Sequence, residues 1–289
     1  MNLAALVLII IKVSIVLTVF AVGLKTNFSD ITFLFRHPRQ LVRAFLSIYV
    51  IMPVIALVLC VAFNLHPAVK IAVGALSLSP IPPLFPSKAD KVVERDDFGI
   101  GLLAGIALLA IVVIPVGMNI FERITEIHLS MSPIAIGIVA FRTVLLPLLI
   151  GAGVRRIAPT VAEKYARPIG IFATVLLVAG VLPVVFVESK AMWSLVGNGT
   201  LVALTLFAVC GLAIGYFSGT ADNRWVLSIA TAMRHPGIAV GIAHTNFPNQ
   251  RLAVPAIALY VLIAGILTAI VSARRKKTIG AVNGIRKAA

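Results

Sequence analysis

Long apolar runs separated by short polar segments dominate the sequence. A helix needs about 20 apolar residues to cross the hydrocarbon core of a membrane, and nine runs approach or exceed that length. They cover residues 3–24, 41–63, 69–87, 98–119, 132–153, 168–187, 194–217, 225–246 and 252–273. No alternating strand pattern accompanies them, so we expect an all-α integral membrane protein with nine transmembrane helices.

Two of these runs contain residues that break a helix. The segment LSLSPIPPLFPSKADK (76–91) carries four prolines within seven residues, and AMRHPG (232–237) places a charge, a proline and a glycine in mid-run. Proline lacks an amide hydrogen and clashes with the preceding turn. We therefore expect breaks near 79–86 and near 233–237. Broken spans at corresponding places in two halves are typical of transporter binding sites.

The places of the two breaks indicate an inverted repeat that lacks its first helix. Runs six to nine would mirror runs one to four, and the fifth run would have no partner. We accordingly divide the chain into a first repeat half (1–130), a second repeat half (131–274) and a basic cytoplasmic tail (275–289).

Composition and charge agree with a membrane protein. Of the 289 residues 60% are hydrophobic and only 12% are charged, against about 25% charged residues in soluble domains. The formal net charge of +15 lies between the apolar runs, as topology signals do, so we expect no nucleic-acid partner. The two cysteines lie within apolar runs and offer no disulfide or metal framework.

Lysine and arginine predict the orientation. With the N-terminus outside, eighteen of them fall in cytoplasmic segments and four outside, at Lys70, Arg123, Lys190 and Arg251. This asymmetry predicts a multi-pass protein of the cell membrane with its N-terminus outside and its C-terminus cytoplasmic. Its partners would be the lipid bilayer and, at the basic cytoplasmic face, anionic lipids.

Three cations remain inside the runs, at Lys12, Arg142 and Arg234, whereas all ten carboxylates lie outside unambiguous runs. Charge within a membrane is costly and marks a functional site by default. Backbone carbonyls or an anionic ligand would have to satisfy these cations. No nucleophile elbow, zinc-protease motif or phosphate loop occurs, so we expect no enzyme, no catalytic residue and no cofactor.

Three segments give the chain a resemblance to the bile acid:sodium symporter family of organic-anion transporters. VGLKTNFSDITFLFRHPRQL (22–41) is similar to the segment after that family's second helix. HPAVKIAVGALSLSP (66–80) and TAMRHPGIAVGIAHTNFP (231–248) resemble the entry to its first crossing helix and its second crossing helix. The resemblance implies a core domain with two crossing discontinuous helices, formed by runs 2–4 and 7–9, and a panel domain formed by runs 1, 5 and 6.

The sequence departs from the family at its sodium-binding positions. Where sodium-dependent members carry P-G-G-T-A-S-N, this chain keeps Pro80 and then reads IPPLFP. In the second pattern, E-x-G-M-Q-N-S-G, Ala230 replaces the glutamate, while Arg234 and His235 replace the glutamine and asparagine. Sodium needs oxygen ligands, so we expect no metal site here and infer that fixed cations replace the bound ones.

The candidate substrate-binding residues cluster at the breaks, with two cations added. Arg234 would carry the fixed charge or cap a half-helix, and His235 would be a proton carrier or a structural histidine. Hydroxyl groups at the breaks would contact substrate or cap freed backbone. The full set is Ser79, Pro82, Lys88, Arg142, Thr231, Met233, Arg234 and His235.

We therefore expect a secondary transporter of a small organic anion, a carboxylate, that works by alternating access without the usual sodium sites. It would be proton-coupled or uncoupled. The alternatives are a sodium-coupled organic anion or bile acid symporter and, from another class, a membrane sensor or channel-like protein that does not cycle.

Overall fold

The computed structural model describes residues 3–82, 85, 97–125, 134, 138–139 and 141–288, and the elements in these residues are all helices. The prediction of an all-α chain is confirmed for this part. The helices before the first break are α1 (Leu3–Gly23), α2 (Phe28–Ile31), α3 (Phe33–Arg36), α4 (Pro38–Phe45), η1 (Leu46–Ile51), α5 (Met52–Ala62) and α6 (Pro67–Leu78). Those after it are α8 (Asp97–Thr125), η2 (Phe141–Leu145), α10 (Leu146–Ile157), α11 (Pro159–Ser194), α12 (Thr200–Ser218), α13 (Arg224–Ala232), α14 (Pro236–Asn246) and α15 (Ala253–Ala288).

Within the described residues, 6 helical segments are long and apolar enough to cross a membrane. They are Pro38–Ala62, Asp97–Ile120, Pro159–Ser194, Thr200–Ser218, Arg224–Asn246 and Ala253–Lys276. Shorter apolar helices occupy Ile9–Gly23 and Pro67–Leu78, which overlap the first and third predicted runs. The fifth run, 132–153, lies partly outside the described residues, so the count of nine spans stays a prediction.

Two helices extend beyond the predicted runs. The 36-residue α11 begins at Pro159 and passes through Pro168 and Pro183 without ending, because long membrane helices tolerate proline when other groups satisfy the freed backbone. The equally long α15 continues through the basic tail. The segment from residue 275 is therefore an extension of the last helix, since its sequence contains no proline to stop it.

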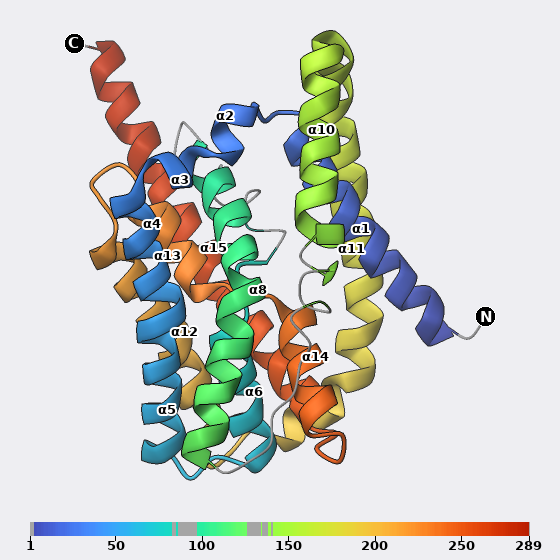
Figure 1. Ribbon diagram of the computed structural model, residues 1–289, viewed down its shortest axis with the longest axis vertical. Coiled ribbons are helices and arrows are strands. Elements are labelled where there is room, and N and C mark those ends of the chain that lie inside the picture. Colours follow the sequence, from blue (N-terminus) through green and yellow to red (C-terminus); the bar gives the residue numbers. More distant parts are fainter. Residues whose placement is uncertain are drawn as a thin grey trace.

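The helices form two groups, seen on the right and left of Figure 1. On the right, α1 packs against both α10 and α11, and these two contact each other. Glycines make the α1–α10 contact close, because a Cβ atom on Gly23 would lie 2.5 Å from the carbonyl oxygen of Leu148, and one on Gly151 would lie 2.5 Å from that of Phe20. This three-helix group meets the larger group through contacts of α11 with α15 and of η2 with α8.

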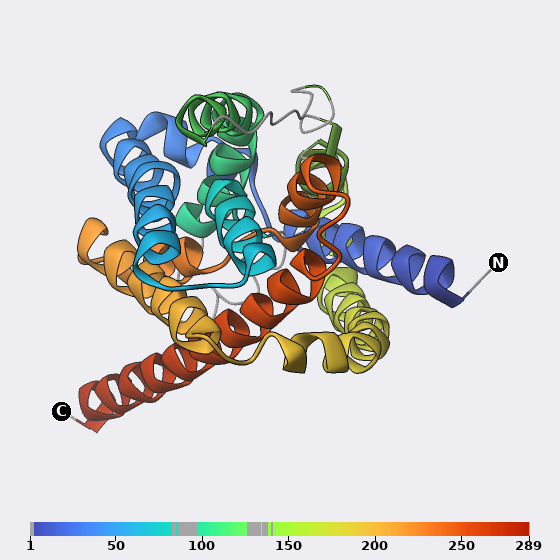
Figure 2. The ribbon, with the colours of Figure 1, turned by 90° about the horizontal axis from the view of Figure 1, so that it is seen from below.

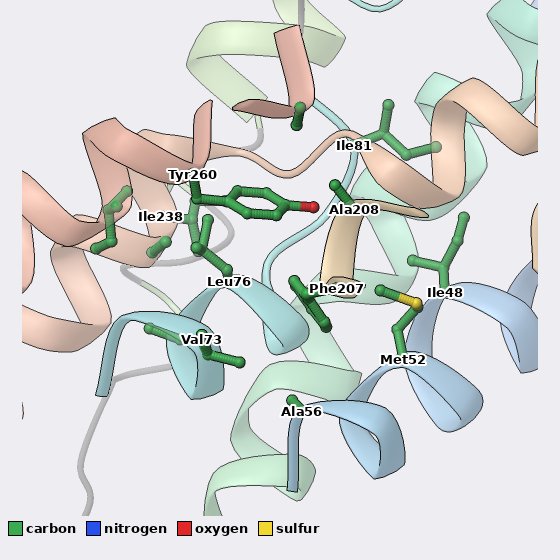
Figure 3. Packing of buried hydrophobic residues seen from close by; sticks show 14 of the residues in the cluster. Ile48, Met52, Ala56, Val73, Leu76, Ile81, Phe207, Ala208, Ile238 and Tyr260 are labelled. Carbon is green, nitrogen blue, oxygen red and sulfur yellow. The ribbon is translucent and has the colours of Figure 1, made fainter. Parts of the chain in front are cut away.

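The larger group surrounds the two short half-helices that adjoin the breaks. Helices α6 and α14 pack on each other and on α15 (Figure 2). The main hydrophobic cluster lies here, and Figure 3 shows Leu76, Ile238 and Tyr260 close together within it. Phe207 of α12 adds a tilted ring contact with Tyr260, with the ring centroids 5.4 Å apart. The breaks are therefore enclosed by protein.

Helix α12 fixes the half-helix α13 by a close backbone contact. A Cβ atom on Gly211 would lie 2.8 Å from the Cα atom of Ala232, and one on Gly215 would overlap the carbonyl oxygen of Leu227. These glycines are four residues apart, which is the small-xxx-small spacing that lets membrane helices approach closely. The contact positions the end of α13, where the second break begins.

Gly215→Ala should therefore destabilise the protein by about 1–3 kcal/mol, the usual cost of an added methyl group in a packed interior. Thermal unfolding in detergent, followed by tryptophan fluorescence, measures the change. The matched control is Gly153→Ala in α10, where an added Cβ meets no atom within 4 Å. Equal unfolding midpoints for the two variants would contradict the close packing of α12 on α13.

Candidate functional site

The two breaks in the chain meet inside the larger group of helices. Helix α6 ends at Leu78 and the chain is not helical from 79 to 82, while α13 ends at Ala232 and α14 begins at Pro236. The amide of His235 donates a hydrogen bond of 2.8 Å to the carbonyl oxygen of Pro80. In the described residues the chain is thus non-helical at 79–82 and at 233–235, and the structure brings these two segments into direct contact.

Arg234 lies at the centre of this contact. Its side chain is only 3% exposed. Its Nη1 atom donates to the carbonyl oxygens of Ile48, at 3.2 Å, and of Ser79, at 3.3 Å. The guanidinium therefore connects the second break to the end of α6 and to η1.

The other two guanidinium nitrogens, Nε and Nη2, are buried and have no hydrogen-bond partner among the described residues. Their N–H groups point from the same edge of the planar guanidinium, the edge that binds a carboxylate through two parallel hydrogen bonds. An unpaired buried donor costs about 1–3 kcal/mol. The site thus presents an anion-binding edge that the described residues around it leave unpaired.

The carbonyl oxygen of Ile48 is available to Arg234 because η1 is a π-helix followed by a proline. In a π-helix a carbonyl accepts from the amide five residues further on, which for Ile48 is Pro53. Proline has no amide hydrogen. The carbonyl oxygen of Ile48 is therefore left without a backbone donor, and Nη1 of Arg234 donates to it in place of the missing amide.

Other side chains donate to backbone carbonyls near the breaks. The Tyr260 hydroxyl donates to the carbonyl oxygen of Ala232 at 2.5 Å. Thr231 donates to the carbonyl oxygen of Leu227 at 2.8 Å, and Ser79 to that of Leu76 at 2.9 Å. Both hydroxyl groups thus donate to carbonyl oxygens of their own helices, and whether they also contact substrate stays a prediction.

His235 begins the half-helix α14. Its Nδ1 accepts a hydrogen bond of 3.3 Å from the amide of Ile238, so the ring hydrogen is carried on Nε2, which is buried and unpaired in the described structure. His66 begins α6 in the same way, accepting from the amide of Ala68 at 3.2 Å. Helices α6 and α14 thus both start with a histidine cap followed by a proline at the first position.

The residues around Arg234 do not fit a sodium ion. The described residues surround the guanidinium with carbonyl oxygens and with Tyr49 and Tyr260, and contribute no carboxylate. The two oxygens best placed to hold a cation already accept from Nη1, and the fixed positive charge repels a second cation. We therefore derive no step that involves sodium at this place.

The remaining candidate residues are distributed unevenly. Pro82 is buried within the first break, and Met233 is half-buried at the end of α13. Arg142 is exposed in η2, so the described structure does not bring it into the buried cluster around Arg234. Lys88 lies outside the described residues. The assignment of these residues to the substrate site stays a prediction.

Sequence reasoning missed three participants in this site. The first is Ile48, whose only signal is the proline five positions later. The others are Tyr260 and Tyr49. The hydroxyl of Tyr49 donates to the carbonyl oxygen of Ile106 at 3.0 Å. A buried tyrosine in an apolar run signals that a polar partner is nearby, but it does not identify the partner.

Comparison with known proteins indicates the family of this chain. The pattern of the Sodium Bile acid symporter family matches residues 12–195, which includes the first break and ends before the second. A rice protein (Oryza sativa subsp. japonica) described as a "probable sodium/metabolite cotransporter BASS2, chloroplastic" is 24% identical over 255 residues, which are 84% of this chain and 58% of the rice protein. The chain thus spans a little over half of that relative's length. On this evidence the chain is a multi-pass membrane protein that belongs to the Sodium Bile acid symporter family.

Proposed function

We propose that this protein is a secondary transporter of a small organic anion and that it works by alternating access without the family's sodium-binding side chains. The observation that carries the proposal is the guanidinium of Arg234. One of its nitrogens is bound to backbone carbonyls at the crossing, and the Nε–Nη2 edge is buried and unpaired. Membership of a transporter family supports the same class and argues against an enzyme.

A carboxylate is the ligand class that suits this edge. Arginine and carboxylate form two parallel charge-assisted hydrogen bonds, which are about twice as strong as neutral ones. The Nε2–H of the neighbouring His235 is a further buried donor without a partner in the described residues. An anion at this place would compensate a buried cation for which the described residues supply no carboxylate.

The two groups of helices supply the moving parts of the proposed mechanism. The three-helix group α1, α10 and α11 corresponds to the panel and the larger group to the core of the family's fold. Movement between them would expose the crossing first to one side and then to the other. The proposal also includes nine spans in an inverted repeat, a cell-membrane location and a cytoplasmic C-terminus. The orientation is supported by the basic segments between α1 and α4 and between α10 and α11, which lie at the same end of the molecule (Figure 1).

The positive charge of Arg234 can be tested by substitution. Arg234→Gln should weaken carboxylate binding roughly ten- to hundred-fold, because hydrogen bonds to a charged group contribute about 1.5–3 kcal/mol. Saturable uptake of carboxylates into proteoliposomes and stabilisation of the purified protein by the same compounds measure the loss. Arg234→Lys should recover only part of the binding, because an ammonium keeps the charge without the two-nitrogen edge.

Lys190→Gln is the matched control, because Lys190 is an exposed cation on α11. It should leave uptake unchanged. The comparison is made on variants whose unfolding midpoints without ligand are similar, since Arg234→Gln also removes the bonds to Ile48 and Ser79. Wild-type affinity in a folded Arg234→Gln protein would contradict the proposal.

Replacing sodium by potassium or choline should leave the initial rate of carboxylate uptake unchanged, because the fixed guanidinium holds the position of a bound cation. Parallel proteoliposome assays with each cation test this expectation. A steep dependence on sodium would favour the alternative of a sodium-coupled symporter that uses other ligands. Non-saturable conductance without accumulation would favour the channel-like alternative.

His235→Asn tests proton coupling. Asparagine is a good N-cap and keeps an acceptor for the start of α14, while it removes the only ring that titrates at the second break. We expect the pH profile of uptake between pH 5 and 8 to keep its shape, because a proton on Nδ1 would break the cap and place two cations on adjacent buried residues. A profile that becomes flat would identify His235 as the proton carrier.

A further inference from the structure

A second feature, which shares no lining residue with the two breaks, is a groove between α1 and α11. It encloses about 590 Å³ and is lined by Val22 of α1, by Lys25 just after that helix, by Arg167, Ile171 and Val175 of α11, by Ile100 of α8 and by neighbouring small residues. A second hollow of about 500 Å³ shares the three residues of α11 and adds Pro168 and Phe172. The two hollows adjoin each other at these shared residues of α11.

The apolar wall of this groove faces outward. Ile171, Phe172 and Val175 are 57%, 58% and 62% exposed. Only 11% of the most apolar stretch of α11 is buried, the smallest share among the candidate spans found in the described residues. In a chain that crosses a membrane, such a surface is in contact with lipid chains. From Arg167 to Val175 the wall extends about 12 Å along the helix, at 1.5 Å per residue.

Positive charge is confined to one end of the groove. Lys25 and Arg167 are both exposed there, and no hydrogen bond or ion pair engages either side chain within the described residues. Glu163, one turn before Arg167, forms no ion pair with it. Arg155 adds a third charge nearby, where it donates to Asn27 Oδ1 at 3.3 Å and to the carbonyl oxygen of Leu24 at 3.4 Å.

We propose that this groove binds one anionic phospholipid. The phosphate would lie between Lys25 and Arg167, and an acyl chain would follow Ile171 and Val175. The combination of two unpaired cations at the polar end with an exposed apolar wall matches the two ends of such a lipid. Basic pockets at the ends of membrane helices attract anionic headgroups. A small soluble carboxylate has no acyl chain that would contact the apolar wall.

The bound lipid would hold α1 against α11 within the three-helix group. Lys25 directly follows the end of α1 at its cytoplasmic side in the proposed topology, and Arg167 lies in the first third of α11. A headgroup shared by these two cations would connect the helices by charge at the end where α1 passes into α2. The site is independent of the transported ion and of Arg234.

Native mass spectrometry of the purified full chain, given equal amounts of phosphatidylglycerol and phosphatidylcholine, tests this proposal. The wild type should retain phosphatidylglycerol preferentially. Lys25→Gln with Arg167→Gln should weaken that retention roughly tenfold or more. The control, Arg39→Gln with Arg43→Gln, removes the same charge from two exposed positions on α4 and should change retention little. Equal losses in the two double variants would overturn the site.

A third variant separates a lipid from a free anion. Val175→Trp keeps both cations and fills the apolar part of the groove, so it should also lower retention of phosphatidylglycerol. Inorganic phosphate should neither compete with the lipid nor stabilise the protein against heat. Unchanged retention in Val175→Trp, or effective competition by phosphate, would overturn the proposal of a lipid. All variants are compared at equal unfolding midpoints, so that loss of folding is not mistaken for loss of binding.

Discussion

The structure depends on how two interruptions of membrane-embedded helices satisfy their backbone groups. Within the hydrocarbon region an unsatisfied amide or carbonyl group costs several kcal/mol, and no water is available to replace the lost partner. Here the breaks satisfy each other through the bond from His235 to Pro80. The end of α13 is satisfied by Tyr260, and the start of α14 by the ring of His235. The enclosing helices are arranged to bring these partners to one place.

Arginine suits this place because one guanidinium can bind backbone carbonyls and still present further donors to a ligand. One nitrogen accommodates the carbonyl oxygens of Ile48 and Ser79, as a bound cation would. The planar guanidinium then still has an edge with two donors, which a lysine would not present in a fixed orientation. Burial of the charge is expensive. A site that keeps such a charge without a carboxylate in the described residues is therefore best suited to an anion that arrives from outside.

The sequence was sufficient to predict the helical class, the two breaks and the unusual cation at the second one. Each of these follows from a local property, such as a run of prolines or an arginine within an apolar segment. The partners of Arg234 could not be predicted, because they depend on the packing of η1 beside the breaks and on the carbonyl that Pro53 leaves free. The length of α11 was also missed, because the predicted run stopped at the charged residues on either side, such as Lys164 and Glu188, whereas the helix continues through them.

A fixed cation has a consequence for the direction of transport. In a symporter the coupling ion moves with the substrate and compensates its charge. When the compensating charge is Arg234, it stays with the protein and the translocated anion carries its own negative charge. The membrane potential then acts on that charge with about 2.3 kcal/mol per 100 mV. Under the proposed function, a cytoplasm-negative potential would oppose net uptake of the anion and would favour its export or its exchange for another anion.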